Sequence, residues 1–84
     1  MELSKNARAI YKDMTEQYII CFRRIKKEEF FKAGIYAYII TGYDGVIHKA
    51  KSSGNINNHD TAYLLKVLRD YLMCIYRALE EIEV

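Results

Sequence analysis

Apolar residues return every three or four positions along the first third of the chain. This spacing places a side chain on the same face at each helical turn and is typical of an amphipathic helix. The pattern predicts a helix from about Ser4 to Ala33, with Gly34 as its stop. The residues that carry the rhythm are Ala7, Tyr11, Met14, Tyr18, Cys21 and Ile25.

The last third of the chain repeats this rhythm more regularly. It predicts a second helix that begins with Asn58 or Asp60 as its N-cap and runs to about Glu83. An adjacent stripe that includes Leu64 and Tyr71 widens the apolar face beyond what one helix and one hairpin easily cover. The main seam consists of Thr61, Leu65, Leu68, Leu72, Ile75, Leu79 and Ile82.

Between the two predicted helices the composition changes to β-branched and aromatic residues. Residues 35–41 and 46–53 have the composition of strands. Asp44-Gly45 between them is a strong hairpin signal, because a type I′ turn needs positive φ at both central positions. We therefore expect a β-hairpin with one small apolar face. Its other face would carry Tyr36, Tyr38, Ile40, Ile47, Lys49 and Lys51.

The expected order is helix, strand, strand, helix, which is an α+β fold (αββα) in a single domain covering residues 1–84. The chain would return to its starting side after the hairpin, so that the two helices would run antiparallel. A lone hairpin is marginal unless it gains neighbours. We therefore expect a homodimer that shares a sheet or a helical bundle, with a monomer as the alternative. The expected dimer interface consists of Leu65, Leu68, Leu72, Ile75 and Leu79.

A hairpin followed by a long leucine-rich helix, between Gly34 and about Leu79, resembles the opening half of roadblock- or longin-type scaffold domains. Those domains continue with further strands after the helix, whereas this sequence ends at Val84. The resemblance implies a dimerising scaffold that binds other proteins.

Length and composition limit the class of protein. With 84 residues, 51% of them hydrophobic and 29% charged, the chain suits one globular domain rather than a disordered segment. No apolar stretch resembles a signal peptide or reaches the roughly 18 residues of a membrane span, so we expect a cytoplasmic protein with no membrane partner. Residues with AT-rich codons are abundant, which points to a low-GC microbe, a phage or another mobile element. Cys21 and Cys74 are expected to be free thiols.

Few residues have the arrangement that catalysis or metal binding needs. The histidines are His48 and His59, and neither lies in a recognisable nucleophile–base pattern. No Cys or His pair has ligand spacing, so we expect no metal, no cofactor and no enzymatic activity. Residues 42–45 match the GxxG of RNA-binding KH modules, but that loop joins two helices, whereas here we expect it to join two strands.

Positive charge gathers at the end of the first predicted helix, at Arg23, Arg24, Lys26 and Lys27. Cations there suit the negative end of the helix dipole, and they equally suit an anion or nucleic acid. The outer hairpin face suits base stacking, and it also suits a protein contact because tyrosine is enriched at interfaces. A net charge of only +2 favours the protein contact. The expected partner-binding residues are Tyr36, Tyr38, Lys49 and Lys51.

The sequence therefore predicts a small non-enzymatic regulatory or inhibitory protein. Its expected partners are a second copy of itself and a larger protein or nucleoprotein complex, which it would bind stoichiometrically. The alternative is nucleic-acid or nucleotide binding through the basic and aromatic surface. Salt separates the two classes, because phosphate binding weakens steeply as ionic strength rises and a tyrosine-centred contact does not.

Overall fold

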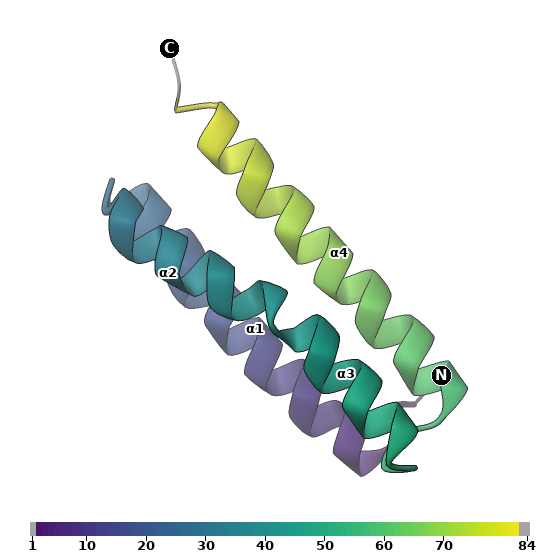
Figure 1. Ribbon diagram of the computed structural model, residues 1–84. Coiled ribbons are helices and arrows are strands. Elements are labelled where there is room, and N and C mark those ends of the chain that lie inside the picture. The colour runs from purple at the N-terminus through teal and green to yellow at the C-terminus, as the bar shows by residue number, and fades with distance from the viewer. Residues whose placement is uncertain (1, 83–84) are drawn as a thin grey trace.

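Residues 2–82 are described by a computed structural model, and they form four α-helices and no strand (Figure 1). The helices are α1 (Lys5–Lys26), α2 (Phe30–Thr41), α3 (Tyr43–Ser52) and α4 (Asn58–Glu80). The predicted α+β fold with a central hairpin is therefore wrong, and the chain is all-α across the described residues. The resemblance to roadblock or longin-type domains fails with it, because it depended on the hairpin.

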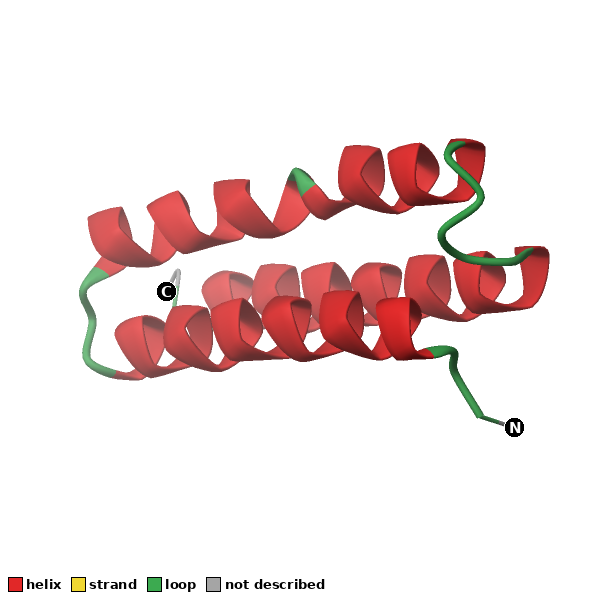
Figure 2. Ribbon diagram, turned by 90° about the horizontal axis from the view of Figure 1, so that it is seen from below, coloured by secondary structure: helices red, strands yellow, loops and turns green. Residues whose placement is uncertain are grey.

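The four helices form three rods. α3 continues in the direction of α2, and together they lie as one layer over α1 and α4 (Figure 2). The chain runs up along α1, down along α2 and α3, and up again along α4, so α1 and α4 are parallel (Figure 1). The predicted antiparallel arrangement of the first and last helices is wrong for this reason. The bundle measures 45 × 19 × 17 Å.

The first helix begins where the sequence predicts and ends earlier. The Ser4 hydroxyl accepts a hydrogen bond from the Ala7 amide at 3.3 Å, which satisfies one free N–H of the first turn. The helix stops at Lys26, and Glu28 then has a φ of 60°, in the left-handed region that ends a helix. The predicted stop at Gly34 lies inside α2.

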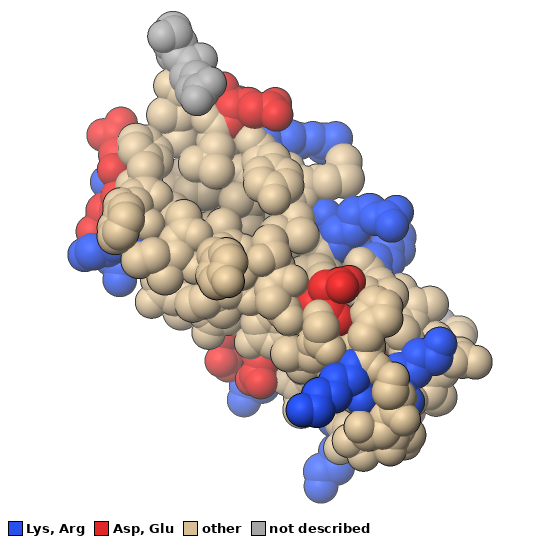
Figure 3. Space-filling view, viewed as in Figure 1, with Lys and Arg blue, Asp and Glu red and all other residues tan. Residues whose placement is uncertain are grey.

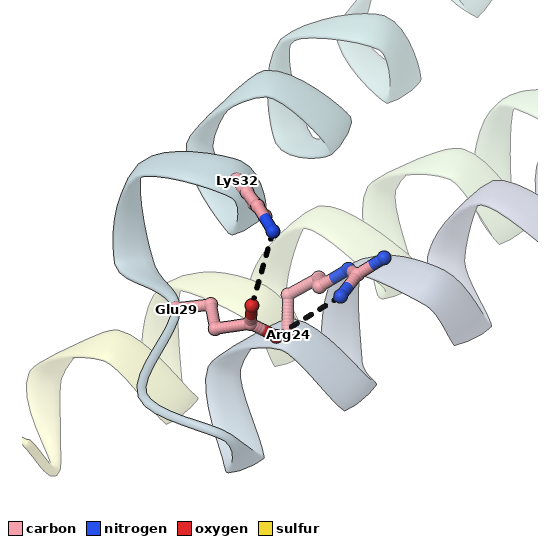
Figure 4. Close-up of polar contacts among 3 residues, drawn as sticks. All are labelled: Arg24, Glu29 and Lys32. Carbon is pink, nitrogen blue, oxygen red and sulfur yellow. Dashed lines mark hydrogen bonds and ion pairs between the residues drawn. The ribbon is translucent and has the colours of Figure 1, made fainter.

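Ion pairs close the corner between α1 and α2. The Glu29 carboxylate lies 3.0 Å from a guanidinium nitrogen of Arg24 and 3.2 Å from the Lys32 ammonium (Figure 4). Hydrogen bonds from these two cations hold the pKa of Glu29 below its ordinary value. One carboxylate thus links the last turn of α1 to the first turn of α2, and this link helps to fix the direction of the chain reversal.

The middle of the chain is helical because its apolar residues also follow a helical rhythm. The positions that pack inward alternate in steps of three and four, while β-branched and aromatic content alone suggested strands. Strand propensity reflects how a side chain packs, and burial against α1 and α4 overrides it here. The inward positions are Ala33, Tyr36, Ile40, Tyr43, Ile47 and Ala50.

The expected hairpin turn is the start of α3. Asp44 lies in the first helical turn, and its carbonyl oxygen is 2.8 Å from Nδ1 of His48, one turn later. Gly42 has a helical φ of −65° and ψ of −19°, so the break between α2 and α3 is slight. Between residues 2 and 82 positive φ occurs only at Glu28 and Gly54, and a type I′ turn is therefore excluded. Residues 42–45 do join two helices, but most of them form the first turn of α3 rather than a loop.

The start of α4 is held against the start of α1. The N-cap is Asn57 rather than the predicted Asn58 or Asp60, and it forms a capping box with Asp60 at the third helical position. The buried Asp60 carboxylate also accepts hydrogen bonds from the Ser4 hydroxyl at 2.8 Å and from the Ser4 amide at 3.2 Å. One carboxylate therefore completes the N-termini of both parallel helices.

Aromatic contacts hold α1 to α4 farther along. The rings of Tyr18 and Tyr71 stack with centroids 4.2 Å apart and planes within 8°. The Tyr71 hydroxyl lies 2.7 Å from the Thr15 hydroxyl. Burial, with a smaller contribution from neighbouring Cys74, raises the pKa of Tyr18 to about 12. Cys21 is buried in the core and Cys74 is exposed, and both are free thiols.

Candidate functional site

Helix α2 is apolar on nearly every side. Lys32 is the only charged residue between Phe30 and Tyr43. A helix of this kind is normally enclosed by protein, but α2 is covered on one side only. Phe31 is 83% exposed and Tyr38 is 79% exposed. Such exposure of large apolar side chains in one element makes α2 a candidate contact surface.

A groove opens between the α2–α3 rod and α4. Its volume is about 490 Å³. Figure 3 shows this face of the molecule, where a broad uncharged area extends over α2 and the facing part of α4 and charged groups lie at its margins. The residues that line the groove are Thr41, Asp44, Leu65, Leu68, Arg69, Leu72, Met73 and Tyr76. We call this feature the α2–α4 groove.

The α4 wall of the groove is mainly hydrophobic. Met73 and Tyr76 are exposed there, and Leu65 and Leu72 are half-buried between them and the core. Arg69 is the basic group of the lining and forms no ion pair with any residue in the range 2–82. The groove thus combines a mainly apolar α4 wall, which Arg69 interrupts, with the Asp44 carboxylate on the facing side. Such a surface suits an apolar helix that carries an acidic side chain opposite Arg69.

The predicted leucine seam is divided between the core and the surface. Leu68 and Ile75 are buried inside a single chain. Leu65, Leu72 and Leu79 are half-buried. Leu65 and Leu72 line the α2–α4 groove, and the buried Leu68 reaches its floor. Part of this seam therefore packs the bundle itself, and part remains at the surface.

The structure does not bring the predicted partner-binding residues onto one face, since the hairpin on which they were placed does not exist. Tyr38 is exposed on α2, whereas Tyr36 is half-buried and faces α1. Lys49 and Lys51 are exposed in the last turn of α3. Among these four residues, Tyr38 belongs to the uncovered part of α2.

Three of the four predicted anion-binding residues lie together. Arg23, Arg24 and Lys27 line a small cavity of about 230 Å³ together with Ile20 and Tyr36. The predicted antiparallel helices would have placed this cluster beside the start of the last helix. Because α1 and α4 run parallel, it lies toward the C-terminal end of α4 instead (Figure 1).

Lys26, the fourth basic residue, lies on another side of α1. Its ammonium is 6.0 Å from the centre of the Phe22 ring. It lines a hollow together with Ala78 and Glu81 near the end of α4. The four predicted anion-binding residues therefore do not form a single surface.

The histidines stand apart from one another. His48 is exposed on α3, with a ring nitrogen 3.8 Å from the Asp44 carboxylate, and His59 is exposed at the start of α4. In the described part of the chain no three His, Cys, Asp or Glu side chains converge as metal ligands would. None of the helices within residues 2–82 has both the length and the apolar character of a membrane span.

Comparison with protein-family models, with curated proteins and with solved structures finds no match for this chain. The geometry of the α2–α4 groove is therefore the basis for the functional inference. Sequence reasoning missed five of its lining residues. The missed residues on α4 could have been found from the sequence, because they adjoin the leucine seam on its exposed side. Nothing in the sequence pointed to the missed residues near the predicted hairpin turn. The missed residues are Thr41, Asp44, Arg69, Met73 and Tyr76.

Proposed function

We propose that this protein works by stoichiometric binding, as a small cytoplasmic regulator or inhibitor that holds a helix of a larger protein in the α2–α4 groove. The observation that carries the proposal is the open groove between two rods, with a leucine, methionine and tyrosine wall. Aromatic residues and methionine are the types enriched at protein interfaces. The contact is therefore expected to be with protein.

An α-helix is the shape that fits this groove. Three rods are in place, and a fourth lying between the α2–α3 rod and α4 would complete a four-helix bundle. Helices bound in grooves use apolar anchors spaced at i, i+3, i+4 and i+7. The apolar wall of α4 follows a matching spacing from Leu65 through Leu72 to Tyr76.

Charge at the groove would orient the bound helix. Arg69 has no ion-pair partner in the described residues, and Asp44 lies on the opposite wall. An acidic residue of the partner helix would pair with Arg69. Charges at the rim of an interface chiefly set register and association rate, so the apolar wall would supply most of the affinity.

Site-specific photo-cross-linking in cells tests this proposal. We expect benzoyl-phenylalanine placed at Met73 or Tyr76 to trap one discrete partner protein upon irradiation. The same probe at Ile19, an exposed apolar residue on the outer side of α1, should trap none. Equal labelling from all three positions, or no adduct from the groove positions, would contradict the proposal.

The trapped partner then allows an affinity measurement. Tyr76→Ala should weaken its 1:1 binding at least tenfold in calorimetry, which corresponds to about 1.4 kcal/mol or more. Ile19→Ala serves as the matched control and should leave affinity unchanged. An unchanged affinity for Tyr76→Ala would show that the adduct forms outside the groove.

A second candidate function is anion or nucleic-acid binding at the cavity of Arg23, Arg24 and Lys27 beside Tyr36. Its support is the cavity itself, which these three cations line together with Tyr36, while Arg24 also pairs with Glu29. Raising salt from about 50 to about 200 mM should reduce such binding steeply, because each phosphate contact releases counterions. Binding in the groove should change far less over this range.

A further inference from the structure

Helix α2 exposes a second apolar surface that the groove does not use. Its centre is formed by Phe31, Gly34, Ile35 and Tyr38, which recur at helical spacing on the side of α2 away from the core. We call these four residues the α2 stripe. None of them lines the α2–α4 groove.

We propose that the α2 stripe packs against the α2 stripe of a second copy, forming an antiparallel symmetric dimer. The proposal goes beyond the groove function and depends on different residues. A two-fold contact is self-complementary, so that residue i meets residue j and j meets i. The α2 stripe must therefore match its own shape and charge when it is turned end to end.

The order of large and small residues along the stripe is what fits a second copy. Phe31 and Tyr38 are large, and Gly34 and Ile35 lie midway between them. In an antiparallel pair centred between Gly34 and Ile35, each Phe31 meets Tyr38 of the other copy. Each Ile35 lies over the bare backbone of the opposite Gly34. Aromatic pairs of this kind add to the stabilisation from burial alone.

Gly34 supplies the space that close approach of two helices requires. It is exposed, and a Cβ placed on it would meet nothing within 4 Å in the single chain. Glycine lowers the stability of a helix interior relative to alanine. The single chain thus gains nothing from glycine at this position, whereas a helix of a second copy can approach closely there.

Charge and area are compatible with a weak dimer. Lys32, the only charge in α2, is paired with Glu29, so the stripe can be covered without burying a free charge. Phe31, Ile35 and Tyr38 are 83, 47 and 79% exposed. At about 200 Å² for a whole large side chain, they offer roughly 400 Å² per copy and roughly 800 Å² per pair. This is below the roughly 1,000 Å² of a stable specific interface, so we expect a weak dimer that dissociates at high micromolar concentration.

Sedimentation equilibrium of the full chain tests the proposal. From about 1 to about 300 µM, the average mass should rise from the 9.9 kDa of one chain toward twice that value. Tyr38→Glu should stay at 9.9 kDa throughout, whereas Ile19→Glu, an exposed control on α1, should dimerise like the wild type. A wild-type chain that stays monomeric, or a dimer that Tyr38→Glu leaves intact, would overturn the proposal.

A second pair of variants distinguishes a loss of dimerisation from a loss of folding. Gly34→Ala should raise the melting temperature of the dilute monomer and yet weaken dimerisation at least fivefold, because the new methyl occupies the space of the opposite Ile35. Gly45→Ala replaces another exposed glycine with open space around it, in α3, and should raise the melting temperature without weakening the dimer. Equal dimerisation by both variants would contradict the packing proposed at Gly34. The cross-links from the groove do not depend on either result.

Discussion

Replacing Ile40 with alanine should lower the free energy of unfolding by about 2 to 5 kcal/mol, the range for an isoleucine removed from a closed core. The same change at Ile39 should cost less than about 1 kcal/mol, as is usual for a surface position. The reason lies in the helical geometry of α2, which makes Ile40 0% exposed and leaves its neighbour Ile39 40% exposed. Urea denaturation followed by circular dichroism measures both values.

This pair of variants also decides between the helix and the hairpin. In the hairpin, Ile39 would lie on the small inward face and Ile40 on the outward face, so the larger loss would belong to Ile39→Ala. The helix gives the reverse order. Equal losses at the two positions would agree with neither arrangement, and would indicate that α2 is enclosed on both sides by an oligomer.

Replacing Asp60 with asparagine should lower the melting temperature markedly at neutral pH. The carboxylate accepts hydrogen bonds from the Ser4 hydroxyl and amide and from the Asn57 amide, and asparagine cannot accept all three in the same geometry. At least one of these donors at the N-termini of α1 and α4 would then lack its acceptor. Thermal unfolding monitored by circular dichroism measures the loss.

The pKa of Asp60 determines how the stability lost in Asp60→Asn changes with pH. Burial acts to raise the pKa of Asp60, but the hydrogen bonds from Ser4 and Asn57 outweigh it and hold the pKa below the ordinary 3.8. A carboxyl with a depressed pKa contributes its full stability above the ordinary value and loses it as pH falls through the folded-state value. The gap between wild type and Asp60→Asn should therefore be widest near neutral pH and close below pH 3.8.

Asp70→Asn is the matched control for this experiment. Asp70 lies exposed on the same helix, where it pairs with Lys66 at 2.9 Å. Exposed pairs contribute little, so this variant should follow the wild-type curve closely. A constant difference between Asp60→Asn and wild type from neutral to acid pH would show that shape, and not charge, makes Asp60 important.

The sequence predicted the two long helices from their apolar rhythm, although the stop at Gly34 and the N-cap at Asn58 or Asp60 were wrong. Ser4 begins α1, and the seam from Thr61 onward follows α4. The prediction for the middle segment was wrong because two features of its sequence conflicted. The β-branched composition and Asp44-Gly45 favoured a hairpin. The spacing from Ala33 through Ile40 to Ile47 favoured a helix. Burial against two long helices decided in favour of the spacing, and composition carried no information about that burial.

Only the α4 wall of the groove could be predicted in part from the sequence. Leu65 and Leu72 lie on the predicted seam, but whether a seam residue faces the core or a groove depends on where the other rods lie. The error in the middle segment removed one of these rods from the predicted fold. Hence Leu68 and Ile75, which pack inside the chain, could not be separated from their surface neighbours.

The parallel course of α1 and α4 gives the molecule a direction. The chain enters the bundle at one end of its 45 Å length and leaves at the other (Figure 1). In the antiparallel dimer proposed through the α2 stripe, the two bundles point in opposite directions. Each end of the dimer therefore presents the start of one bundle and the finish of the other. Two partner helices held in the two grooves would then run in opposite directions. If both grooves of the proposed dimer are filled, the two large proteins would be related by the same two-fold axis as the two chains.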